Sequence, residues 1–120
     1  MRVTLEKVLT EDAYKQTIPL AERFAKGVEA VIAEHQLPWI IKQLGCRVEY
    51  WFRPEPPKNG SEAAAAADSE LDRYMHLAAL NRGILMTPFH NMALIAPGTS
   101  NADVDHHTQV FKESVELLLQ

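Results

Sequence analysis

The residues whose types best suit chemistry lie in one short segment, residues 87–92, with the sequence TPFHNM. A histidine and an asparagine stand there between two short apolar runs, where packing gives little reason for polar side chains. An ordinary turn is the alternative, because Asn favours turns and His is tolerated in them. The residue types alone favour the turn, and the segment remains a candidate site beside that reading.

Histidines near carboxylates suggest metal sites at two places. Adjacent residues of a helix point about 100° apart, so His106 and His107 cannot easily share one ion. Asp103 and His107 are four residues apart and could supply two ligands, but no third ligand is evident. We therefore expect a solvated helix start there and no metal. Asp72 and His76 are also four apart, and a surface ion pair is expected between them.

Nucleophilic, phosphate-binding and nucleic-acid chemistry find little support. Cys46 would need a basic partner, and Arg47 points the opposite way if both lie in a strand. No serine stands in a G-x-S-x-G turn, and no glycine-rich phosphate loop is present. Tyr50 and Trp51 with Arg47 and Arg53 could form a stacking platform for single-stranded nucleic acid. The acidic balance of the chain favours half-buried sheet residues instead.

Composition limits the classes of protein further. The chain has 120 residues, 47% of them hydrophobic, a net charge of −4 and 12 scattered basic residues. This argues for one ordinary globular domain and against a nucleic-acid or anionic-membrane ligand, which selects for a concentrated basic face. One cysteine excludes an intrachain disulfide and fits a reducing cytoplasm. The N-terminus lacks the apolar core of a signal peptide, and no run is long enough to span a membrane.

The first half of the sequence predicts a helix followed by a hairpin. Thr10 is a helix N-cap, and apolar residues recur at helical spacing through about residue 36. Pro19 predicts a kink or a restart near Ile18. The runs PWIIKQL and RVEYWFR then predict two antiparallel strands joined at Gly45. A proline-rich loop leads into an alanine run, for which helix and disorder both remain open.

The second half predicts two more helices with two strands between them. Asp68 or Ser69 caps a helix that stops at Gly83. The runs ILMTP and MALIAP predict a second strand pair, and Ser100 with Asp103 resembles a capping box. The inner face of this last helix is expected to hold Val104, Thr108, Phe111, Val115 and Leu118. The order predicts an α+β domain: a small antiparallel sheet with three helices packed on it.

Three runs carry a family resemblance: GCRVEYWFRPEPP, LNRGILMTP and ALIAPGTSNADVDHHTQVF. Together they resemble the C-terminal part of class III pyridoxal-phosphate (PLP) aminotransferases, in the branch around glutamate-1-semialdehyde aminomutase. The resemblance extends from Leu5 to Leu119. It implies that residues 1–120 form the small C-terminal domain of such a fold-type I enzyme. It also implies that the large PLP-binding domain is absent from this chain.

The resemblance implies that the chain is inactive alone. In the family, the lysine that binds the cofactor and the aspartate that pairs with its ring nitrogen belong to the large domain. None of the six lysines here matches that lysine; they are Lys7, Lys15, Lys26, Lys42, Lys58 and Lys112. We therefore expect no catalytic, cofactor-binding or metal-binding residue in this chain, and PLP only in the full-length enzyme. The resemblance places Phe89, His90, Asn91 and Met92 in the wall of the substrate pocket.

The implied partners are the large domain of the same enzyme and a second copy of the chain. A domain shaped to sit against another should expose apolar surface, which we expect near residues 39–52 and 84–95. The alternative is a stand-alone α+β module that binds a partner or senses a small ligand without catalysis. The sequence leaves open the substrate, transaminase against aminomutase activity, and whether the chain is a natural short protein, half of a split enzyme or a fragment.

Overall fold

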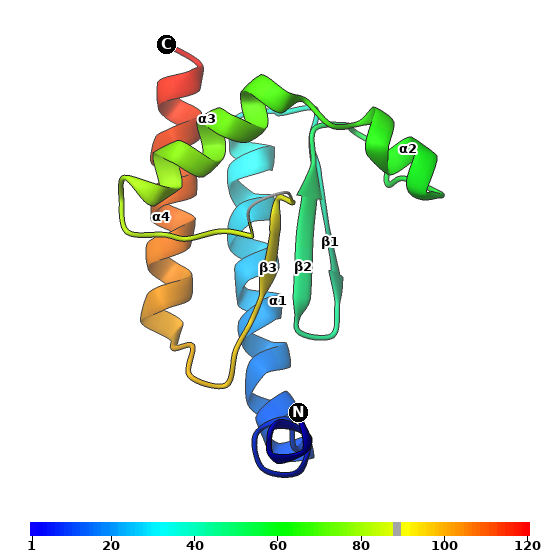
Figure 1. The fold of residues 1–120 in the computed structure, drawn as a ribbon. Coiled ribbons are helices and arrows are strands. Elements are labelled where there is room, and N and C mark those ends of the chain that lie inside the picture. Colours follow the sequence, from blue (N-terminus) through cyan, green and yellow to red (C-terminus); the bar gives the residue numbers. More distant parts are fainter. Residues whose placement is uncertain (88–89) are drawn as a thin grey trace.

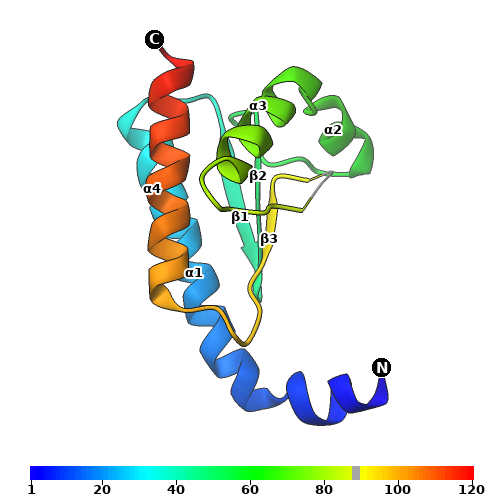
Figure 2. The ribbon, with the colours of Figure 1, turned by 60° about the vertical axis from the view of Figure 1, so that its left-hand side comes forward.

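The computed structural model describes residues 1–87 and 90–120. In chain order its elements are η1 (Thr4–Val8), α1 (Glu11–Glu34), β1 (Ile40–Leu44), β2 (Arg47–Trp51), α2 (Gly60–Ala65), α3 (Ser69–Leu80), β3 (Met92–Leu94) and α4 (Asn101–Leu118). The strands form one antiparallel sheet in the order β1-β2-β3. In Figures 1 and 2, α1 and α4 lie side by side on one face of the sheet, and α3 packs across α4. The predicted α+β fold is confirmed.

The first long helix begins at its predicted cap. The side chain of Thr10 accepts a hydrogen bond from the Ala13 N–H at 3.3 Å. The helix is continuous over 24 residues with Pro19 inside it, so a restart near Ile18 is wrong, and the alternative of a kink there stays a prediction. Proline removes one backbone hydrogen bond, and burial of a whole helix face offsets that loss. The buried face consists of Ala13, Thr17, Ala21, Phe24, Val28, Val31 and Ile32.

The predicted hairpin of β1 and β2 is confirmed. Leu44 lies opposite Arg47 at the turn, and Ile40 lies opposite Trp51 at the far end. Gly45 in the turn has a φ of 58°, a conformation that glycine adopts without the steric cost of a Cβ. The alanine run after the hairpin is helical over α2, which is capped by Asn59 and buries no residue.

The second predicted hairpin is wrong. Residues 84–87 form no strand, and the run MALIAP supplies only β3. This strand pairs with β2, with Met92 opposite Glu49 and Leu94 opposite Arg47. An isolated two-stranded hairpin is marginally stable, whereas a third strand added to an existing pair completes a sheet over a core. The apolar pattern predicted the strand but could not identify its partner.

The core lies between the sheet, α1 and α4. Val48 and Tyr50 of β2 are 0% and 3% exposed. The Tyr50 ring centre lies 5.3 Å from that of Phe111 on α4, and Trp39 lies 6.2 Å from both rings. Burial, with the negative charge of Asp72 adding to it, raises the pKa of the Tyr50 hydroxyl. Tyr50 is therefore an uncharged residue of the core, on the face of β2 that the helices cover.

The last helix begins at the predicted capping box. The Ser100 hydroxyl accepts from the Asp103 N–H at 3.3 Å, and the Asp103 carboxylate accepts from the Ser100 N–H at 2.8 Å. Hydrogen bonds from the backbone and side chain of Ser100 lower the pKa of Asp103. Leu118 was expected on the buried face and is 39% exposed. The C-terminal end of α4 extends past the sheet (Figure 1), and residues 116–120 are exposed.

The expectation of a solvated pair at His106 and His107 is wrong for His107. Its side chain is buried, and its ring stacks on Phe24 of α1 with the ring centres 4.1 Å apart. Burial, with a smaller effect of neighbouring His106, lowers the pKa of His107 to about 4. His106 stays at the surface, with its Nε2 atom 3.0 Å from the carbonyl oxygen of Arg82. One imidazole therefore belongs to the core and the other to the surface.

Candidate functional site

The predicted wall residues lie where the chain enters β3. Phe89 lies outside the described residues. His90, Asn91 and Met92 follow it. Met92 lies opposite Glu49, and His90 contacts the side chain of Glu49, on the sheet face that α1 and α4 do not cover (Figure 2). A groove of about 450 Å³ opens there between β2 and α2, lined by residues of β2, the alanines of α2, Asp72, His90 and Asn91. Tertiary structure thus brings two of the predicted wall residues to a groove.

Glu49 is the residue of this groove that the sequence analysis missed. Its side chain is only 8% exposed, although it lies on the sheet face away from α1 and α4. One carboxylate oxygen, Oε2, pairs with the guanidinium of Arg47. The other, Oε1, lies 3.2 Å from Nδ1 of His90. A buried carboxylate requires such partners, and the acid in the middle of the strand run RVEYW was the available signal.

Asn91 is fixed by side-chain and backbone contacts. Its Nδ2 donates to Asp72 Oδ1 at 2.7 Å, and its carbonyl oxygen accepts from the Tyr50 N–H at 3.0 Å. Its Oδ1 is buried and meets no hydrogen-bond donor among the described residues. The surface ion pair expected between Asp72 and His76 is therefore wrong. Asp72 lies on the face of α3 that turns toward the groove, and it accepts from Asn91 instead.

The groove offers hydrogen-bonding chemistry rather than covalent chemistry. Its polar groups are two carboxylates, a guanidinium, an imidazole and a carboxamide, from Glu49, Asp72, Arg47, His90 and Asn91. No lysine is among its lining residues, so the groove supplies no amine that could hold PLP as an imine. Among the described residues, no group of three or more His, Cys, Asp or Glu side chains is placed to hold a metal ion.

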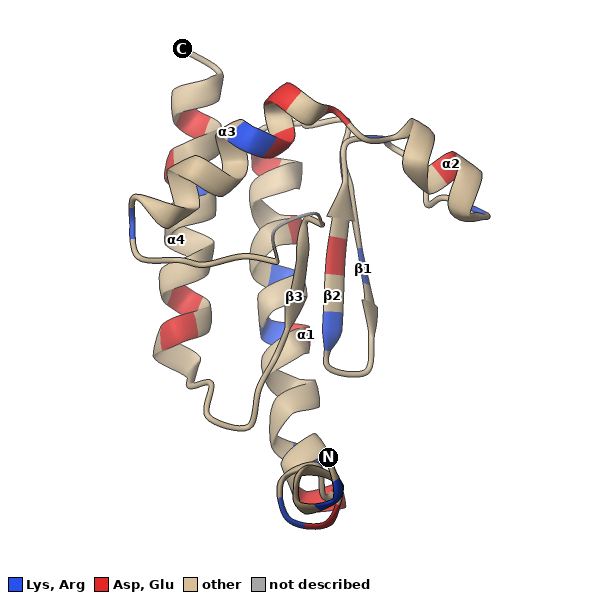
Figure 3. Ribbon diagram, in the orientation of Figure 1, with Lys and Arg blue, Asp and Glu red and all other residues tan. Residues whose placement is uncertain are grey.

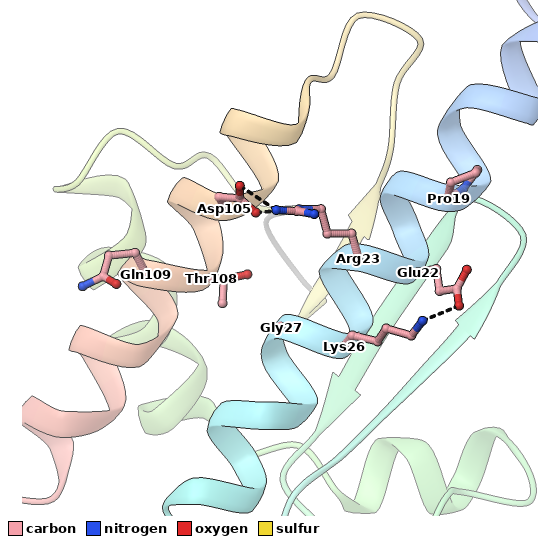
Figure 4. A pocket seen from close by; sticks show the side chains of 8 residues that line it. All are labelled: Pro19, Glu22, Arg23, Lys26, Gly27, Asp105, Thr108 and Gln109. Atoms are coloured by element: carbon pink, nitrogen blue, oxygen red, sulfur yellow. Dashed lines mark hydrogen bonds and ion pairs between the residues drawn. The ribbon is translucent and has the colours of Figure 1, made fainter.

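A second groove, between α1 and α4, does not offer free polar groups (Figure 4). Its volume is about 580 Å³. Arg23 makes two hydrogen bonds to Asp105, at 2.6 and 2.9 Å, and Lys26 pairs with Glu22 at 2.7 Å. The Thr108 hydroxyl donates to a backbone carbonyl of its own helix. The charged side chains of this groove pair with one another, either between α1 and α4 or within α1. We therefore assign no ligand to this groove.

Charged residues of both signs are distributed over the described part of the chain. Figure 3 shows basic and acidic positions interspersed over the helices and strands. This agrees with the small net charge of −4. Within the described part of the chain, no helix is long and apolar enough to cross a membrane.

Comparisons with known proteins converge on one group of enzymes. No model of a protein family matches the chain. The chain is 28% identical over 112 residues to glutamate-1-semialdehyde 2,1-aminomutase 2 of Halalkalibacterium halodurans, a match over 92% of this chain and 26% of that protein. The crystal structure of a glutamate-1-semialdehyde aminomutase from Pseudomonas aeruginosa is 43% identical, with a TM-score of 0.94 over 98% of this chain and 26% of that one. A variant of the same enzyme was solved in complex with PMP.

A more distant structure shows how widely the fold is shared. An omega-transaminase from Sphaerobacter thermophilus is 18% identical with a TM-score of 0.75, over 90% of this chain and 25% of that one. The chain thus spans about a quarter of the length of the relatives it matches. It is a homologue of glutamate-1-semialdehyde aminomutases and has the fold of the C-terminal domain of PLP-dependent aminotransferases.

Proposed function

We propose that the chain is the C-terminal domain of a class III PLP-dependent aminotransferase or aminomutase. Such an enzyme transfers an amino group between an amino acid or amine and an oxo acid or aldehyde. The observation that carries the proposal is the 43% identity to the Pseudomonas aeruginosa aminomutase, at a TM-score of 0.94 over 98% of this chain. Because that match covers only 26% of the aminomutase, residues 1–120 are proposed as one small domain that is inactive alone.

In this proposal the PLP-binding lysine belongs to a large domain outside these 120 residues. The absence of a lysine from the lining of the β2–α2 groove supports that division. Residues 89–92 then form part of the substrate-pocket wall, with His90 and Asn91 at the groove. The intact enzyme is proposed to be a cytoplasmic homodimer.

The sheet face away from α1 and α4 is the surface that we propose lies against the large domain. Leu44 and Leu94 flank the hairpin end of this face and are 79% and 62% exposed. Trp51 and Met92 on the same face are half-buried. Apolar side chains grouped on one face are characteristic of surfaces that a partner covers. This matches the expectation that apolar surface lies near residues 39–52 and 84–95.

The function is tested by replacing the C-terminal quarter of the Pseudomonas aeruginosa aminomutase with this chain. We expect the chimera to bind PLP and to transfer amino groups, because the replaced and inserted parts share one fold. The same enzyme truncated before that quarter should be inactive. Activity is measured as amino-group transfer, and cofactor binding by the absorbance of the PLP imine.

A pair of matched variants tests the proposed contact face. Leu94→Lys should lower the activity of the chimera, because it places a charge on an apolar interface. Leu119→Lys changes a side chain of similar exposure, 56%, at the far end of α4 and should leave activity unchanged. A well-folded chimera that neither binds PLP nor transfers amino groups would contradict the proposed function.

A further inference from the structure

A carboxylate of α3 holds one residue of the proposed pocket wall. Oδ1 of Asp72 accepts a hydrogen bond from Nδ2 of Asn91 at 2.7 Å, although the two residues lie 19 positions apart in the chain. The backbone of Asn91 is held from another side, because its carbonyl oxygen accepts from the Tyr50 N–H of β2 at 3.0 Å. Asn91 is therefore attached to both α3 and the sheet, immediately before β3 begins at Met92.

The contact with Asp72 also fixes the orientation of the Asn91 carboxamide. A carboxylate can only accept hydrogen bonds, so the NH₂ group of Asn91 faces Asp72 and its Oδ1 atom faces away. That oxygen is buried and meets no donor among the described residues. Within this part of the chain, Asp72 is thus the side-chain partner that orients the carboxamide. A hydrogen bond to a charged partner is roughly twice as strong as one between neutral groups.

The helix that carries Asp72 is itself firmly packed. Three residues of α3 are buried, and the hydroxyl of Tyr74 donates to the carbonyl oxygen of Ser114 on α4 at 2.7 Å. Residues 84–87, which follow α3, form no helix or strand. A hydrogen bond from a fixed helix therefore supports a wall residue that lies beyond an irregular part of the chain.

We propose that Asp72 is a positioning residue for the wall of the substrate pocket. Its carboxylate ties the segment that enters β3 to α3 and thereby fixes where Asn91 stands beside the groove. Substrate then binds against a wall that is already in place, so less binding energy is lost in ordering that wall. The pocket wall rests on the proposed function, whereas the link between α3 and β3 rests on the two hydrogen bonds.

Exchanging the two side chains in the chimera tests the positioning role. Asp72→Ala should raise KM about tenfold with little change in kcat, because losing a charged hydrogen bond loosens the wall for substrate and transition state alike. Asp72→Asn should keep KM near its original value, since the amide oxygen still accepts. Asn91→Asp should raise KM, because two carboxylates then face each other. Combining Asp72→Asn with Asn91→Asp reverses donor and acceptor and should restore KM, and failure to restore it overturns the proposal.

The 120-residue chain gives an independent measure of the hydrogen bond. By NMR, the side-chain NH₂ hydrogens of Asn91, assigned by their loss in Asn91→Asp, should exchange with water about tenfold faster in Asp72→Ala than in the unmodified chain. Glu70→Ala removes an exposed carboxylate from the same helix and should change neither this exchange nor KM. An inactive unmodified chimera would overturn the proposed function, while the exchange would still test the hydrogen bond. An active chimera in which Asp72→Ala leaves KM unchanged overturns the positioning role alone.

Discussion

Lowering the pH from 7 to 4 should reduce the free energy of unfolding by about 3 kcal/mol through His107 alone. Burial lowers the pKa of His107 from 6.5 to about 4 in the folded chain. The unfolded chain therefore binds a proton more readily between these two values. Stability is highest above pH 6.5, falls as the pH drops toward 4 and levels off below it. For a small domain this is a large part of the total stability.

The effect is measured by urea unfolding at several pH values between 7 and 4.5. The carboxylates with lowered pKa values are already ionised in the unfolded chain over the upper part of this range, so they contribute little to the slope there. His107→Leu removes the titrating group and fills a similar volume, so its stability should vary less with pH. His76→Gln on α3 should keep the full dependence. An unchanged slope in His107→Leu would show that His107 is not the group responsible.

Gly27→Ala should destabilise the fold by up to about 2 kcal/mol, although alanine favours helix more than glycine does. A Cβ built at Gly27 would lie 2.4 Å from Oγ1 and 2.9 Å from Cγ2 of Thr108 on α4. Thr108 cannot easily turn away, because its χ1 is stiff and its hydroxyl bonds to Val104 O at 3.2 Å. Overpacking costs roughly 1–3 kcal/mol. The gain in helix propensity is about 1 kcal/mol and only partly offsets that cost.

A double-mutant cycle tests whether Thr108 is the cause. Thr108→Ala removes the two closest atoms, so Gly27→Ala in that background should recover much of the lost stability. Gly60→Ala is the matched control, because a Cβ at this helical glycine would meet nothing within 4 Å. Thermal unfolding of the four variants in the cycle provides the measurement. Additive effects, with no recovery in the double variant, would contradict the steric explanation for the close α1–α4 contact.

Local chemistry determined much of the fold from the sequence alone. The caps at Thr10 and Ser100 and the turn at Gly45 occur as predicted. Each depends on residues close together in the chain, whose interaction does not require the rest of the fold. The family resemblance likewise depended on the order of runs along the chain, and the structural match over 98% of the chain agrees with it.

Tertiary structure decided which residues each element meets. His107 lies three residues after Val104 and four before Phe111, a spacing that places it on the buried face of α4. The helical pattern could have shown this, but only the packing of Phe24 against the ring determines that the histidine is buried. Local preferences for a surface charge pair gave the opposite expectation.

The groove between β2 and α2 also depends on contacts that only the tertiary structure makes. Glu49 contacts His90, which is 41 residues away in the sequence, and Asp72 contacts Asn91, which is 19 residues away. The sequence predicted the polar residues near β3 but not their acidic partners, because it could not determine that β3 pairs with β2. Alternation along a strand fixes which side chains share a face, whereas the register between distant strands is settled only when the whole sheet forms over its core.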